Sequence, residues 1–147
     1  MNALEESIVT LAMADTGSDG MNHPQTGAIG GFHQGVAPEG TPFPRMRFQQ
    51  IDDIGVYSFS RLVADHCFYS LVFDAVDDPQ LGEGAAIAGD LAERARSKFT
   101  DPHGLTVNGK TLLYYRFRHA LTPMFTKDST HDRYIYTKGM VLEIWLA

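Results

Sequence analysis

The sequence contains a single cysteine, Cys67, among its 147 residues. One cysteine cannot form a disulfide within the chain, and it excludes a zinc site built from several thiolates. Cys67 lies in an apolar run, where a thiol usually packs as a small hydrophobic side chain rather than acting as a nucleophile. The cysteine content therefore predicts a protein that is made and used in a reducing, aqueous compartment.

Long apolar runs are also missing. No stretch approaches the roughly 20 apolar residues that a membrane-spanning helix needs. The N-terminus, MNALEESIVTLAMAD, is acidic and has no basic segment followed by an apolar one. We therefore expect neither a signal peptide nor contact with a membrane.

Positive charge is scarce. The chain has 12 Lys and Arg against 18 Asp and Glu, a formal net charge of −6. Because non-specific affinity for nucleic acid comes from Lys and Arg that neutralise phosphates, this balance argues against a protein that grips DNA or RNA. It suits a surface that nucleic acid passes without binding.

What the sequence does have is the composition of a globular protein, with 44% hydrophobic and 20% charged residues. A chain of this length normally forms one domain. We expect a single domain over 1–147, with a helix and a Gly/Pro-rich arm in 1–44 and a sheet-and-helix core in 45–147. The arm follows from composition, since residues 15–44 hold seven of the 14 glycines and four of the seven prolines.

Apolar periodicity predicts the regular elements. Helices are expected at 3–14 and from about 83 to 99, the second with an Ala-rich stripe that includes Ala85. Strands are expected near 32–36 and at 45–51, 65–76, 112–121 and 134–146, the last with a bulge at Gly139. Loops are expected at 52–60 and 122–132, and Asn108-Gly109 predicts a hairpin turn.

The strand at 65–76 has two unlike faces. Its odd-numbered residues from Cys67 to Ala75 are all apolar and predict a core face, whereas the other face mixes His66, Phe68, Val72 and Asp74. Helix, arm, two strands, helix and a final set of strands is the order of an α+β protein. We predict an antiparallel β-sheet with one long amphipathic helix packed on it, plus a short N-terminal helix and long loops.

Residues that resemble chemical motifs do not form convincing sites. His66 and Cys67 are adjacent on a strand and face opposite ways, so they cannot bind one metal together. A group of His119, Asp128, His131 and Asp132 would form only if the 119–132 segment folded back on itself. Ser129, His131 and Asp132 include the residue types of a catalytic triad but follow no nucleophile elbow. The glycine-rich stretch 26–31 contains no lysine and is a poor phosphate cradle. We predict no catalytic residue, no metal and no cofactor.

Arginines form the most distinctive pattern. Arg45 and Arg47 share one strand face, and Arg116 and Arg118 share another, which makes a basic stripe in an acidic protein. Such a stripe is either a solvated surface or a surface that binds acids of a neighbouring subunit, because Arg pairs with carboxylates and is enriched at interfaces. The acids of the opposing patch would include Asp74, Asp77, Asp90 and Glu93. The predicted contact residues are Arg45, Arg47, Arg116, Arg118, Phe68 and Val72, together with Met124, Phe125 and Lys127 in a protruding loop.

Residues 35–44, GVAPEGTPFP, followed by a strand, carry a resemblance to a family. This segment is similar to the aliphatic-Ala-Pro-x-Gly-x-x-x-Pro start of tail terminator (tail-completion) proteins of long-tailed bacteriophages. The order downstream is also similar: an apolar strand, an Ala-rich helix, a hairpin at 105–109, and a terminal strand preceded by His131-Asp132-Arg133-Tyr134. The glycine-rich segment 15–31 is longer than a minimal member needs.

The resemblance implies a homo-oligomeric ring of six copies in the neck of the virion, made in the bacterial cytoplasm. Such a ring ends the tail tube, joins it to the head connector, and lets DNA pass through its lumen without specific binding. Its partners would be further copies of the chain, the tail tube protein and the connector or stopper protein. The same composition suits another neck component, such as a head-closure or stopper protein. A small ligand-binding or enzyme domain is the more distant alternative.

Overall fold

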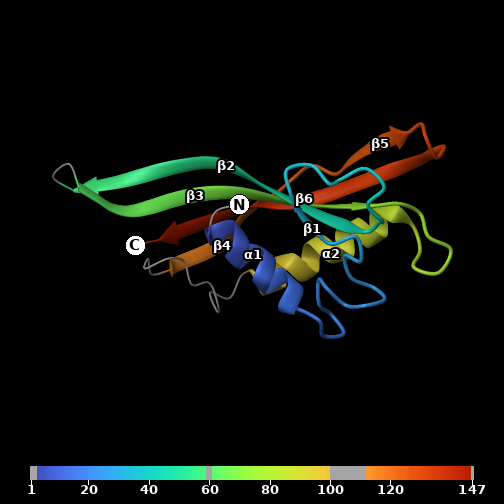
Figure 1. Ribbon diagram of the computed structural model, residues 1–147, viewed down its shortest axis with the longest axis horizontal. Helices are drawn as coiled ribbons and strands as arrows, with labels where there is room; N and C mark the ends of the chain where they lie inside the picture. Colours follow the sequence, from blue (N-terminus) through green and yellow to red (C-terminus); the bar gives the residue numbers. More distant parts are fainter. Residues whose placement is uncertain (1–2, 59–60, 100–111, 147) are drawn as a thin grey trace.

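In the part of the chain that the structure describes, two helices cover one face of a six-stranded sheet (Figure 1). A computed structural model describes residues 3–58, 61–99 and 112–146, with side chains at 4–52, 66–99 and 117–145. The elements are α1 (Ala3–Ala14), β1 (Phe32–Gln34), β2 (Arg45–Ser58), β3 (Arg61–Ala75), α2 (Gly84–Lys98), β4 (Leu112–Ala120), β5 (Met124–Asp128) and β6 (Arg133–Leu146). The predicted α+β fold class is confirmed, and only the short β1–β2 pair is parallel.

The strand order β1-β2-β3-β6-β4 places β3 and β6 in the middle of the sheet, and β5 pairs with β6. β4 and β5 lie end to end along the same side of β6, because Ala120 is opposite Met140 and Met124 is opposite Thr137. The pairing of β3 with β6 ends at Ala75 and Tyr136. Beyond that point β5 and β6 continue as a two-stranded ribbon, which runs above the start of α2 at the right of Figure 1.

The core lies between the sheet and the helices. The predicted core face of β3 is confirmed, since Cys67, Tyr69, Leu71, Phe73 and Ala75 are all buried. β6 adds Met140, Leu142 and Ile144, and α1 adds Leu4, Ile8 and Ala12. The buried side of α2 includes Ala88, Leu91, Ala92 and Ala95 as predicted, but it uses Ile87 in place of Ala85, which is exposed.

The prediction of a loop at 52–60 is wrong for residues 52–58, which continue β2 against β3. Asp52, Asp53 and Gly55 disfavour a strand by their own propensity, but pairing with a long neighbour outweighs that preference. The register shifts between Gln50 and Asp52, which leaves Ile51 without an opposite residue, as in a β-bulge. The β2–β3 hairpin thereby extends the sheet at the end opposite the β5–β6 ribbon (Figure 1).

Two further predictions need correction, and one stays untested. Residues 124–128 form β5 rather than part of a loop, because they pair along β6. Gly139 is not at a bulge, since the β3–β6 register passes through Val72 and Gly139 without a shift. Glycine is required there because an added Cβ would overlap the carbonyl oxygen of Leu71 and lie 2.7 Å from the Cα of Val72. The predicted turn at Asn108-Gly109 lies outside the described residues.

The Gly-rich segment after α1 packs against the body of the protein. Met21 and Ala28 are buried in the core. Arg94 of α2 holds the segment by donating hydrogen bonds from Nη1 to the carbonyl of Gly20 (3.0 Å) and to Oγ1 of Thr26 (3.1 Å). The arm thus contributes core residues, although its composition allows little regular structure.

Candidate interaction surfaces

Asp74 of β3 is the centre of an ion-pair cluster on the sheet face that is turned away from the helices. We call this face, with Arg45, Arg47, His66, Phe68, Val72, Asp74, Arg118, Val141, Glu143 and Trp145, the open face. Asp74 is only 2% exposed. Arg47 donates to it from Nε (2.6 Å) and Nη2 (2.9 Å), Arg45 from Nε (3.3 Å), and Thr137 from Oγ1 (2.7 Å).

The electrostatics of this cluster keep Asp74 charged. Burial by itself would raise the pKa of Asp74, but the hydrogen bonds from Arg47 and Thr137 and the nearby guanidinium charges hold it below its ordinary value. The hydrogen bond with Asp74 also raises the pKa of Arg47. A buried carboxylate with this many donors is a preorganised ion pair rather than an unsatisfied charge.

The position of Asp74 corrects the sequence-based picture of the interface. The sequence predicts Asp74 in a patch that binds the arginines of another subunit, whereas in the structure it pairs with Arg45 and Arg47 of its own chain. Two guanidinium groups share this one carboxylate, so the cluster retains an excess of positive charge. Arg47 is 32% exposed, and among the described residues none accepts a hydrogen bond from its Nη1.

Glu143 of β6 forms a second cluster on the open face. It is 2% exposed, and it pairs with Nε2 of His66 at 2.7 Å and with Nη1 of Arg118 at 3.5 Å. The ring of His66 stacks on Trp145 with a centroid distance of 4.0 Å. The backbone of Arg116 lies opposite Glu143 in the β4–β6 register, but its side chain is outside the described part.

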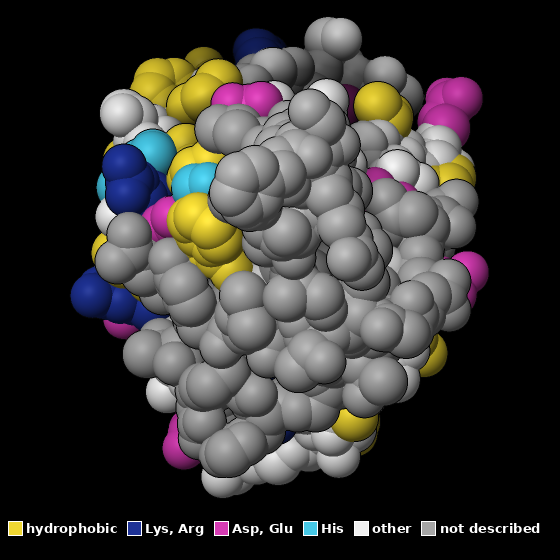
Figure 2. Space-filling view, turned by 90° about the vertical axis from the view of Figure 1, so that its left-hand side faces the viewer, with side chains coloured by type: hydrophobic (Ala, Val, Ile, Leu, Met, Phe, Trp, Pro, Cys, Tyr) yellow, Lys and Arg dark blue, Asp and Glu magenta, His cyan; other side chains and the backbone are white. Residues whose placement is uncertain are grey.

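The open face therefore combines basic and apolar groups. Arg118 is half exposed, and Phe68 and Val72 are half-buried, as a contact surface requires. Figure 2 shows Lys, Arg and His side chains gathered with hydrophobic and some acidic ones along its left margin, whereas its right margin shows acidic and hydrophobic side chains. The basic groups of this acidic protein are thus gathered in one region of that view.

The β5–β6 ribbon carries the three remaining predicted contact residues. Met124 is 62% and Phe125 70% exposed, and the side chain of Lys127 is 56% exposed. Phe125 contacts Tyr134 edge to face with ring centroids 5.8 Å apart. A two-stranded ribbon is by itself only marginally stable in water. Burying its exposed apolar side chains against another surface would stabilise it, so the ribbon is a candidate contact site.

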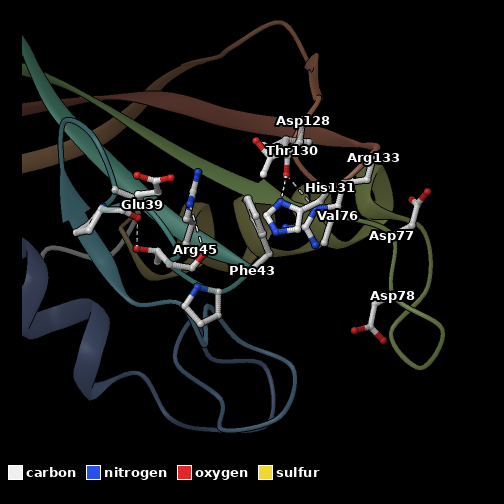
Figure 3. Close-up of a pocket in the computed structure, with 16 residues that line it drawn as sticks. Glu39, Phe43, Arg45, Val76, Asp77, Asp78, Asp128, Thr130, His131 and Arg133 are labelled. Carbon is white, nitrogen blue, oxygen red and sulfur yellow. Dashed lines mark hydrogen bonds and ion pairs between the residues drawn. The ribbon is translucent and has the colours of Figure 1, made fainter.

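A cleft of about 530 Å³ separates the arm from the ribbon (Figure 3). Its walls come from residues 37–43, from the turn after β3, and from the β5–β6 hairpin. The guanidinium groups of Arg45 and Arg133 lie 4.3 Å and 5.1 Å from the ring centroid of Phe43. Both guanidinium groups already pair with carboxylates of this chain, Arg45 with Asp74 and Arg133 with Asp128. The arginines that line the cleft therefore already have acidic partners. Sequence reasoning had not identified this cleft, because only the folded arm brings Phe43 to these arginines.

The structure does not gather the His and Asp residues of the 119–132 segment into one group. No group of three or more His, Cys, Asp and Glu among them is arranged to hold a metal ion. His131 and Arg133 both pair with Asp128, while His119 lies opposite Val141, eight positions farther along β6 than Arg133. In the described part of the chain, no helix combines the length and apolar character needed to cross a membrane.

Comparisons with known proteins give a likeness in fold. No protein-family model and no curated protein matches the sequence. The structure is similar to a chain in the solved structure of the virion of a native gene transfer agent (GTA) particle, with a TM-score of 0.57. The likeness covers 97% of this chain and 94% of that chain at 11% sequence identity, and it shows that the two chains share a fold.

Proposed function

We propose that this protein is a non-catalytic structural component of a phage-like virion. In this proposal about six copies form a ring in the neck, which ends the tail tube and joins it to the head connector. DNA passes through the ring without specific binding.

The observation that carries the proposal is the extent of the fold likeness. It covers nearly the whole of this chain and of the chain from the GTA virion particle, so it is not a shared fragment. The GTA chain is part of a virion, and a virion protein acts through its contacts with other subunits. This likeness supports a virion role, and the motif at 35–44 adds the resemblance to tail terminators.

The distribution of surface groups supports assembly into a ring. A ring needs two different patches on each subunit, because head-to-tail contacts are heterologous. The open face carries Arg45, Arg47 and Arg118, and the β5–β6 ribbon exposes Met124 and Phe125. The exposed side of α2 carries Asp90 and Glu93 beside Arg96. An acidic protein repeated around a channel would repel DNA and let it slide.

Particles assembled without this protein test the proposal. If the protein ends the tail tube, electron micrographs will show tails of uncontrolled length. Tails of normal length that fail to join heads would instead assign the protein to head closure or stopping. Particles indistinguishable from those of the parent would contradict a structural role in the neck.

A further inference from the structure

The ribbon exposes an aromatic residue and a cation on one face. Phe125 and Lys127 are two residues apart on β5, so their side chains point to the same side, with Cβ atoms about 7 Å apart. Phe125 packs beside Tyr134 and beside its cross-strand partner Tyr136, whose ring centroid lies 6.5 Å away. This packing holds the exposed ring in a defined position.

The formal charge of the β5–β6 ribbon does not repel an acidic surface. The ribbon carries Lys127 and Arg133 against Asp128 and Asp132, so its formal charges cancel in a chain of net charge −6. Lys127 pairs with Asp132 at 3.4 Å, but the two side chains are 56% and 91% exposed. Such exposed pairs contribute little stability, so Lys127 can exchange Asp132 for another carboxylate.

A pocket of about 300 Å³ lies beside α2, between the helix and the segments that precede it. It is lined by Thr26, Leu81, Ala86, Ile87, Asp90 and Arg94. A cavity of roughly 150 Å³ is enough to hold a benzene ring, so this pocket can accept the side chain of a phenylalanine. Leu81 is 37% exposed, which leaves an apolar wall open to a partner.

Asp90 places a carboxylate beside this pocket. It is 60% exposed and pairs with Nη2 of Arg94 at 2.9 Å, one helical turn away. Ile87 and Asp90 are three residues apart on α2 and lie on the same side of the helix, with Cβ atoms about 5–6 Å apart.

We propose that Phe125 of one copy inserts into the α2 pocket of the next copy, where Lys127 pairs with Asp90. This inference rests on the proposed ring and assigns its subunit contact. The occupant is a second copy because both halves of the contact, with complementary charge, lie on this chain. The contact joins two unlike patches, as the heterologous contact of a ring does when it repeats from copy to copy.

Charge exchange tests the contact. We expect Phe125→Ala and Lys127→Glu each to raise the concentration at half-assembly about tenfold or more, measured by sedimentation or single-particle mass. The double variant Asp90→Lys with Lys127→Glu restores assembly, because it re-creates the pair with reversed signs. Both ribbon side chains are exposed, and unchanged unfolding midpoints verify that the variants fold.

Glu93→Lys with Lys127→Glu is the matched control, since Glu93 is an exposed acid of α2 outside the pocket. It should not restore assembly. The inference is overturned if both ribbon variants assemble normally, if Asp90→Lys fails to rescue, or if the unaltered protein stays monomeric at every concentration.

These experiments separate failure of the Phe125 contact from failure of the proposed function. Normal assembly of Lys127→Glu, together with uncontrolled tails in particles that lack the protein, would remove only the Phe125 contact. Rescue by Asp90→Lys, together with unaltered particles in the absence of the protein, would keep the contact and remove the neck assignment.

Discussion

Arg47 binds Asp74 through two hydrogen bonds, from Nε at 2.6 Å and from Nη2 at 2.9 Å. The pair is diagonal, because Arg47 lies opposite Val72 in the β2–β3 register and Asp74 lies opposite Arg45. This geometry brings both arginines of β2 to one carboxylate. The cluster therefore links β2, β3 and, through Thr137, β6 at the open face.

Removing Arg47 should destabilise the fold. Arg47→Ala leaves the buried Asp74 with only Arg45 and Thr137 as partners, and we expect the free energy of unfolding to fall by about 1–3 kcal/mol. Urea denaturation at pH 7 measures this loss. Gln49→Ala, at an exposed position on the same strand, is the control and should change stability by less than about 0.5 kcal/mol. Equal effects of the two substitutions would contradict the role of the cluster.

The stabilisation of the fold by Asp74 should decrease as the pH falls. Its folded-state pKa lies below the unfolded value of about 3.9, so its ionised form stabilises the protein above that value. The stabilisation is lost as the pH falls through the lower, folded-state pKa. We expect Asp74→Asn to be about 2 kcal/mol less stable than the parent at pH 7.

The pH dependence is measured as the difference in unfolding free energy between the parent and Asp74→Asn from pH 7 to pH 3. This difference isolates Asp74 from the other carboxyl groups. We expect it to stay constant down to about pH 4 and to narrow at lower pH. If the difference in unfolding free energy stays constant from pH 4 to pH 3, or widens there, the charge of Asp74 does not stabilise the fold.

Gly139→Ala tests the close approach of β3 and β6. The added methyl group would overlap the carbonyl oxygen of Leu71, and backbone cannot rotate out of the way as a side chain can. We expect a loss of about 3 kcal/mol in unfolding free energy. Gly17→Ala is the control, because an added Cβ meets nothing within 4 Å there. A Gly139→Ala protein as stable as Gly17→Ala would contradict the packing.

Arg118 tests whether the open face takes part in assembly. Arg118→Gln removes the guanidinium without adding an acid, and we expect severalfold weaker assembly with a stability change below about 1 kcal/mol. Charge reversal at Arg118 would place a second carboxylate beside the buried Glu143, so it would test folding as much as assembly. Lys98→Gln on α2 is the control. Undiminished assembly of Arg118→Gln would exclude Arg118 from the contacts between subunits.

The sequence alone predicted the features that depend on local residue patterns. Alternation identified the core face of β3, and helical spacing located α1 and most of α2. It was insufficient for β5 and for the second half of β2, since their polar residues form strands only because long neighbours pair with them. The partners of Asp74 could not be predicted either, because Arg47 and Thr137 lie 27 and 63 residues away in sequence.

Immunogold labelling of purified particles tests the central claim most directly. The claim is that this chain is a structural component of the virion neck. Gold-labelled antibodies against the protein should bind intact particles at one place, the junction between head and tail. Particles that carry no label, or that carry it along the whole tail, would contradict the account.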